Sequence, residues 1–267
     1  MCYDPMIEKI VLKLSKDIYQ DGLQPSVQTL GQELAQIFSA LKIVTLPFAA
    51  MGHTADCLLE KYKIFLHDSI NKVKPENRIP PQPRISTPIL QNVQVAFEQK
   101  DIYELYSNLL ASASDKNTCD DVHPAFITIV SQLTSLEVRL LEKIKPEFAI
   151  PYYSLQFYKP EEHVYFPLSE PVCFIDDMNE NYTSLTSGLE NLQRLGLIYK
   201  IPHLYTEDQS DFQAKKNDLI SLLFKYDSVY AQLLAEFSPQ NIRVDPGFFK
   251  PTVLGRKFLS ACSGPQS

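Results

Sequence analysis

The chain has 267 residues, of which 45% are hydrophobic and 21% are charged, so it can bury a sizeable core and does not have the composition of a disordered protein. Its formal net charge of −7 opposes nonspecific attraction to nucleic-acid backbones and anionic lipids, because both need clustered lysine and arginine. The five cysteines are far apart and form no CxxC pair, and the amino terminus lacks a secretion signal, so we expect reduced thiols in a cytoplasmic protein.

Amphipathic helices are predicted throughout the first third of the chain. Apolar residues recur every three or four positions over residues 6–20, 26–41 and 58–70, which is the period of a helix with one buried face. Pro47 predicts a break after the second helix. We assign residues 1–74 to an N-terminal helical region.

A proline-rich stretch follows this region. Five prolines lie between Pro75 and Pro88, where each removes a backbone donor and fixes φ. We therefore expect residues 75–88 to form a stiff, extended connector.

A central helical core is predicted over residues 89–146. Three segments within it have helical apolar periodicity, namely residues 89–97, 102–113 and 134–144. The last of them starts with Thr134 and Glu137 at capping-box spacing.

Another helix start is indicated by Pro124, a residue suited to the first helical turn, with Asp121 or His123 as its cap. A metal site at His123 would need partner ligands, and the other histidines do not have zinc-ligand spacing. We assign structural or capping roles to His123 and Pro124, and we expect neither a metal nor a cofactor.

After Pro146 the pattern changes to short β-branched and aromatic runs that are typical of strands. Two or three strands fit residues 152–175, and further strands are predicted over residues 197–201 and 242–250. Helices are predicted over residues 185–195, 218–237 and 252–262, with Gly196 as a C′ residue. The fold class is mainly α with a C-terminal α+β portion.

Residues 189–198 and 249–255 together resemble the end of a winged helix-turn-helix, in which a leucine-spaced helix enters a Gly-Leu-Ile strand. We therefore predict a winged-helix-like domain over residues 147–267. The residues suited to an interaction or to nucleic-acid contact are Asn191, Gln193, Arg194, Arg256 and Lys257. The acidic chain and the single arginine of this helix favour protein packing over DNA binding.

Residues 34–55 carry one formal charge, Lys42, which raises the alternative of a membrane segment. Several polar residues and Pro47 interrupt the stretch, and a bilayer crossing needs about twenty predominantly apolar residues. We predict a buried helical hairpin, with conditional membrane insertion as the alternative.

Catalytic signatures are missing from the sequence, which has no GxGxxG, phosphate loop, GxSxG elbow or HExxH. Other motifs occur in a recognisable order: the proline-rich approach, Leu105-Tyr-Ser-Asn-Leu-Leu110, His123-Pro-Ala-Phe126 and Gln132-Leu-Thr-Ser-Leu-Glu137. In this order the chain resembles the abortive infection alpha (Abi-alpha) family of bacterial proteins over about four fifths of its length. The family has no known catalytic residue to carry over.

The resemblance implies a bacterial phage-defence protein, and we expect a non-enzymatic component that acts through protein–protein interaction. Its partner is expected to be another protein or a phage component, with a homo-oligomer as a further option. Two alternatives stay open: a membrane-active growth-arrest effector that uses residues 34–55, and a DNA-binding winged-helix regulator.

Overall fold

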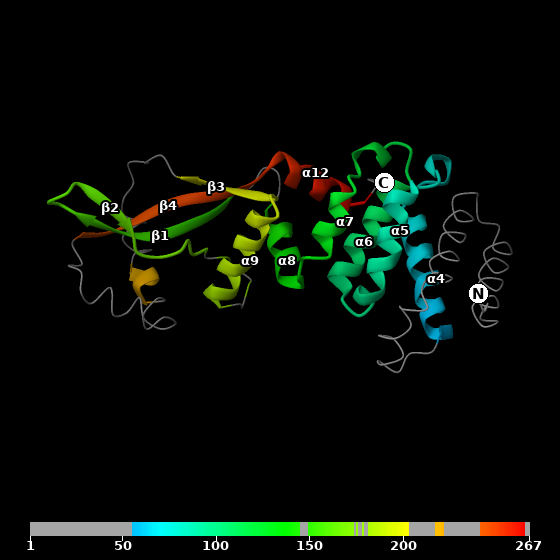
Figure 1. Cartoon of the computed structure of the whole chain (residues 1–267), viewed down its shortest axis with the longest axis horizontal. Coiled ribbons are helices and arrows are strands. Elements are labelled where there is room, and N and C mark those ends of the chain that lie inside the picture. Colours follow the sequence, from blue (N-terminus) through cyan, green and yellow to red (C-terminus); the bar gives the residue numbers. More distant parts are fainter. Residues whose placement is uncertain are drawn as a thin grey trace, which may run out of the picture. The chain divides into compact units, whose positions relative to one another are not determined.

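The structure is a computed structural model of the chain (Figure 1). It describes residues 55–144, 149–173, 175, 178, 181–202, 217–221 and 241–264. The helices predicted over residues 6–20 and 26–41, and the 34–55 region apart from its last residue, lie outside the described residues. The chain forms two compact units: residues 1–138 with 257–267, and residues 139–256.

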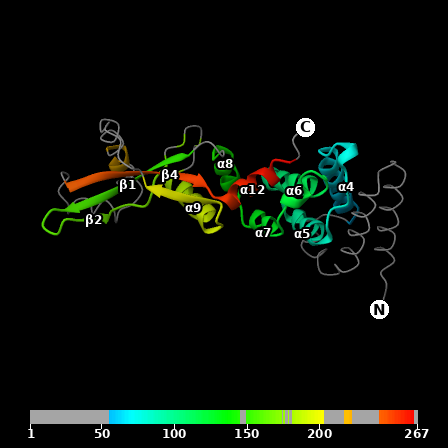
Figure 2. The same cartoon turned by 90° about the horizontal axis from the view of Figure 1, so that it is seen from above.

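Helix α6 (Lys100–Ala113) is the central element of the first unit. It packs against α4 (Ala55–Asn71), α5 (Pro83–Val93) and α7 (Ala125–Val130) (Figures 1 and 2). Its buried apolar residues have helical spacing: Ile102, Tyr106, Leu109, Leu110 and Ala113. The helices predicted from periodicity at residues 58–70 and 102–113 are confirmed.

The proline-rich stretch is less extended than the prediction for residues 75–88 required. A short 3-10 helix, η1 (Pro75–Asn77), interrupts it, and α5 already begins at Pro83. Pro83 occupies the first helical turn, where backbone N–H groups form no hydrogen bond within the helix, so the absence of this group in proline costs nothing. Pro88 lies inside the helix, which costs about 3 kcal/mol.

Burial of the apolar face of α5 offsets that cost. Its buried aliphatic residues are Ile85, Ile89, Leu90 and Val93. Each such side chain contributes about 1.5 to 3 kcal/mol when fully buried, so their sum exceeds the cost of one internal proline. A second 3-10 helix, η2 (Gln94–Ala96), continues the predicted segment 89–97.

Helix α8 (Ser135–Lys143) begins at the predicted capping box. The Thr134 N–H donates to Glu137 Oε2 at 2.6 Å, and the Val138 N–H donates to Thr134 O at 3.1 Å. The prediction of a helix start at this place is therefore confirmed. Among the described residues, none of the helices is both long enough and apolar enough to cross a bilayer.

The second unit contains a four-stranded antiparallel sheet in the order β2-β1-β4-β3 (Figures 1 and 2). Its strands are β1 (Ile150–Lys159), β2 (Val164–Pro167), β3 (Ile198–Pro202) and β4 (Ile242–Pro251). These match predicted strands, and Val172 of the last predicted run forms a bridge with Tyr153. The chain is thus a mixed α/β protein with substantial helix.

Side chains alternate between the two faces of this sheet, and one face carries a hydrophobic cluster. Its buried members are Leu155, Leu168, Val172, Leu219 and Ile242. Gln156, Tyr158 and Arg243 have the opposite parity in the strand register, so their side chains lie on the other face.

Helix α9 (Tyr182–Arg194) ends against the start of α12 (Val253–Cys262). Gly196 follows α9 with a φ of 73°, the left-handed conformation predicted for this C′ residue. The Thr252 N–H donates to Leu197 O at 2.9 Å. A Cβ on Gly255 would lie 2.0 Å from Leu197 O, so this approach of helix to strand requires glycine.

Replacement of Leu109 by aspartate should unfold the first unit, because Leu109 has no exposed surface and an unpaired buried carboxylate costs several kcal/mol. Thermal unfolding followed by circular dichroism checks this expectation. Ile64→Asp on α4 is the matched control, since 51% of Ile64 is exposed. A soluble Leu109→Asp variant that melts at the wild-type temperature would contradict the assignment of α6 as the core.

Candidate functional site

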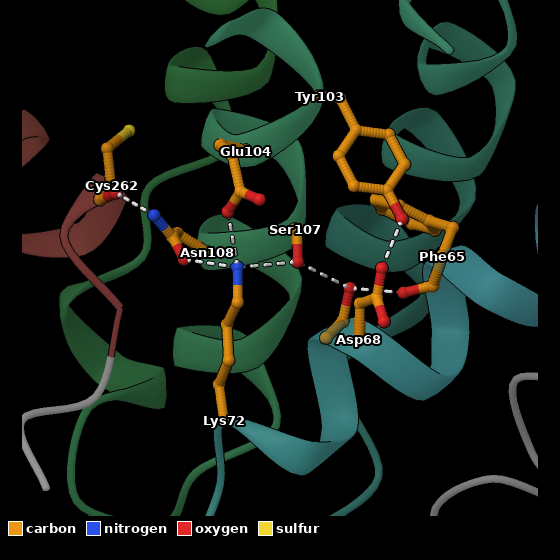
Figure 3. A network of polar contacts seen from close by, with 9 residues as sticks. Phe65, Asp68, Lys72, Tyr103, Glu104, Ser107, Asn108 and Cys262 are labelled. Atoms are coloured by element: carbon orange, nitrogen blue, oxygen red, sulfur yellow. Dashed lines mark hydrogen bonds and ion pairs between the residues drawn. The ribbon is translucent and has the colours of Figure 1, made fainter. Parts of the chain in front are cut away.

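A lysine-centred polar network joins α4 to α6 (Figure 3). Lys72, directly after α4, donates from Nζ to Glu104 Oε2 at 2.8 Å, Ser107 Oγ at 2.9 Å and Asn108 Oδ1 at 2.8 Å. The three acceptors share one face of α6 because they are three and four residues apart. They match the three N–H donors of an ammonium group.

The network continues along α4 through Ser69. Ser69 Oγ donates to Phe65 O at 2.7 Å and lies 3.2 Å from Ser107 Oγ. Ser107 accepts from Lys72 and can donate to Ser69, so the bonds form one directed chain. Nearby, the Tyr103 hydroxyl donates to Asp68 Oδ2 at 2.8 Å, and burial, that bond and the Asp68 charge raise the pKa of Tyr103 (Figure 3).

The same face of α6 holds the end of the C-terminal helix. Asn108 Nδ2 donates to Cys262 O at 2.7 Å, and Ser112 Oγ donates to Ala261 O at 2.8 Å. The last carbonyl groups of a helix receive no hydrogen bond from the helix itself, and these two side chains supply the missing donors. Phe258 packs edge-on against Phe126 with ring centroids 5.5 Å apart.

The lysine–serine pair could suggest a nucleophilic site, but its accessibility argues for structure. Ser107 is completely buried, so no substrate reaches its hydroxyl without opening of the helices. Burial also disfavours the nucleophilic thiolate form of two cysteines, because it raises the pKa of Cys173 to about 12 and that of Cys262 well above its ordinary value. The network is therefore a clamp between helices.

A small pocket of about 210 Å³ lies within the first unit, between the chain before α5 and the loop after α6. Its polar lining includes Gln82, Arg84, Cys119 and Asp120, and the remainder is mostly apolar. Ligand pockets usually have about 300 to 1,000 Å³, and the opposite charges of Arg84 and Asp120 select no charged ligand class. Burial and the Asp120 charge raise the pKa of the Cys119 thiol.

His123 and Pro124 lie directly before α7. His123 Nδ1 accepts from the Ala125 N–H at 3.1 Å, the contact of a side chain that caps a helix, and Pro124 occupies the N-cap position. The His123 ring lies 6.0 Å from the Phe126 ring. Within the described ranges, histidine, cysteine and carboxylate side chains do not gather into a metal-binding group of three.

The residues proposed for nucleic-acid contact lie on two helices. On α9, Asn191 Oδ1 accepts from Arg194 Nε at 3.0 Å and Nη2 at 2.7 Å, while Gln193 is exposed. On α12, Arg256 Nη1 donates to Pro251 O at 3.0 Å, and Lys257 lies 4.0 Å from an Asp121 oxygen. Each cationic side chain in this set therefore has a polar partner within the protein.

The hairpin of β1 and β2 carries three of the four large apolar side chains that are exposed in the described sheet, and the fourth is Tyr199 on β3. Val164, Tyr165 and Phe166 are 41%, 44% and 43% exposed. Tyr165 also stacks, with the Arg243 guanidinium 3.4 Å from its ring centroid and the Tyr158 ring at 4.7 Å. We call Val164, Tyr165 and Phe166 the hairpin surface.

Sequence reasoning did not identify the clamp or the hairpin surface. A signal for the clamp exists, because Glu104, Ser107 and Asn108 form a polar stripe beside the apolar face of the helix. Nothing in that stripe names Lys72 or the distant Cys262 carbonyl as its partners. The hairpin surface needs the strand register, which one sequence does not specify.

Asn108→Ala should lower the free energy of unfolding by about 1 to 3 kcal/mol, because it leaves the Cys262 carbonyl and one Lys72 N–H without their partner. Glu104→Ala removes only a half-exposed ion pair and should cost less than about 1 kcal/mol. Urea unfolding of both variants measures the difference. Equal losses would show that the clamp acts through charge and not through the helix carbonyls.

Curated proteins, solved structures and protein families differ in their similarity to this chain. None of the curated proteins matches it. One solved structure, described as an uncharacterized protein from the hydrocarbon-degrading marine bacterium Alcanivorax borkumensis SK2, is 17% identical, with a TM-score of 0.33. That match covers 52% of this chain and 96% of the other, and its low score supports no inference. The model of the family described as abortive infection alpha matches residues 57–262, and the chain therefore belongs to this family.

Proposed function

We propose that the chain is a non-enzymatic component of anti-phage defence of the abortive infection type, and that it acts in the cytoplasm through protein–protein interaction. Membership of the abortive infection alpha family over residues 57–262 supports the defence role. The burial of Ser107 and of the Cys173 and Cys262 thiols supports the non-enzymatic reading of those groups.

The hairpin surface is the single observation that carries the interaction role. Three consecutive large apolar residues are each more than two fifths exposed in a strand of four residues. Val164 and Phe166 lie on one face of the strand and Tyr165 lies on the other, so apolar side chains flank the edge on both faces. Exposed apolar side chains gathered in this way are typical of an interaction surface, whereas scattered ones are ordinary.

Neighbouring contacts pre-organise this surface for binding. Gln156 Oε1 accepts from Arg243 Nη2 at 3.2 Å, and Arg243 in turn stacks on Tyr165. Tyrosine and arginine are enriched among residues that dominate binding energy, and a ring already held in place loses little side-chain entropy on binding.

A DNA-binding regulator is the second candidate, and the order α9-β3-β4-α12 favours it. Antiparallel β3 and β4 with a preceding and a following helix resemble the last part of a winged helix. Arg194, however, already donates twice to Asn191, so base contact would require it to exchange these bonds. The membrane-effector alternative concerns residues 34–55, which lie mostly outside the described residues.

Cells that express the chain should resist phages that plate on control cells, with arrest or death of the infected cells. The double variant Tyr165→Ala, Phe166→Ala should lose this protection, because it removes the central apolar contacts of the hairpin surface. A plaque assay over a phage panel, with melting temperature and protein level measured in parallel, checks both expectations.

Tyr199→Ala is the matched control, since Tyr199 lies on the opposite edge strand and is 43% exposed. It should protect as the wild type does. Full protection by the hairpin double variant would contradict the interaction role, and absence of protection by the wild type against every phage would contradict the defence role.

A further inference from the structure

Strand β2 is an open edge of the sheet. It pairs with β1 on one side, and in the described part of the sheet no strand lies on its other side. All four of its residues are exposed. An edge strand with exposed backbone groups can accept a further strand.

The ladder to β1 decides which backbone groups of β2 point outward. The Leu168 N–H donates to Leu155 O at 2.7 Å, and paired residues of an antiparallel ladder alternate between bonded and non-bonded positions. Counted back from Leu168 along this register, the backbone groups of Phe166 and Val164 form hydrogen bonds with β1, whereas those of Pro167 and Tyr165 do not. The N–H and C=O of Tyr165 therefore point away from the sheet.

The sequence of β2 is complementary to itself about this residue. If two copies pair antiparallel with Tyr165 opposite Tyr165, then Val164 of each copy lies opposite Phe166 of the other. Cross-strand pairs of aromatic and β-branched residues stabilise a sheet. On the other face the two Tyr165 rings become neighbours.

Charged residues of the hairpin do not oppose this register. Glu161 and Glu162 lie in the turn before Val164, the first residue of β2, so neither carboxylate belongs to the paired strand. His163 has a φ of 53° and Pro167 donates no hydrogen bond, so the paired segment is confined to Val164, Tyr165 and Phe166.

We propose that β2 pairs antiparallel with β2 of a second copy of this chain, about a two-fold axis at Tyr165, to join the two four-stranded sheets. The pairing is closed, because a two-fold contact uses the same edge of both copies and leaves neither β2 free for a third. This inference rests on the proposed function, since it names the partner of the hairpin surface.

Sedimentation velocity of the full chain, from low to high micromolar concentration, tests the pairing. The wild type should shift from monomer to dimer with concentration. Tyr165→Pro removes the central outward N–H and keeps the bonds to β1, so it should abolish the dimer. Its melting temperature should equal that of Tyr165→Ala, which loses the same ring contacts with Arg243 and Tyr158 but keeps the N–H. Tyr165→Phe is the matched control and should dimerise as the wild type does.

A charge exchange tests the register itself. Two double variants are needed: Val164→Glu with Phe166→Glu, and Val164→Lys with Phe166→Lys. Each should be monomeric by itself, because position 164 faces position 166 of the other copy and like charges repel. An equimolar mixture of the two should form a heterodimer. A wild type that stays monomeric at every concentration, or a mixture that stays monomeric, would overturn the proposal.

The plaque assay separates failure of this pairing from failure of the proposed function. A monomeric wild type whose hairpin variants still lose protection overturns self-pairing and leaves the hairpin surface as a contact for another protein. A monomeric wild type whose hairpin variants keep protection overturns both. Dimerisation together with loss of protection in the monomeric charge variants supports both.

Discussion

The end of the C-terminal helix imposes the main constraint on the first unit. Its final carbonyl groups need donors that the helix cannot provide, and α6 supplies them from Asn108 and Ser112. Asn108 also accepts a hydrogen bond from Lys72, so one side chain joins both the end of the C-terminal helix and the end of α4 to α6. Loss of one side chain therefore exposes unsatisfied groups on two other segments.

The two parts of the first unit are far apart in the sequence. The first unit contains residues 1–138 and 257–267, and the second unit, residues 139–256, lies between them in the chain. The first unit therefore lacks its C-terminal helix until the second unit has been passed. Contacts such as Asn108 to Cys262 join residues 154 positions apart, and such closure is slow to form because it orders a long loop. The second unit can instead form its sheet from residues within its own span.

Periodicity alone predicts most of the described elements. The helices at α4, α6, α8 and α9 and the strands β1, β3 and β4 follow from apolar spacing, and Gly196 from the geometry of a helix end. The start of α5 does not follow from local propensity, because proline disfavours a helix there, whereas burial of Ile89 and Leu90 stabilises it. A tertiary contact thus overrode a local preference.

The candidate sites were less predictable than the elements. The polar stripe of Glu104, Ser107 and Asn108 is visible in the sequence, but its partners come from two distant segments. The hairpin surface depends on register, since a shift of one residue would turn Tyr165 to the opposite face. The residues predicted for interaction on α9 and α12 are polar or cationic, and these properties can be read from the sequence whereas strand register cannot.

Hydrogen exchange of the α6 amides tests the central constraint most directly, with the full chain compared to a chain that ends after Lys257. We expect the shortened chain to lose protection along α6 and at the end of α4, because Phe258 and the two carbonyl contacts are absent. Strand β1 should keep its protection, since its ladder lies within the second unit. Unchanged protection of α6 in the shortened chain would contradict the account.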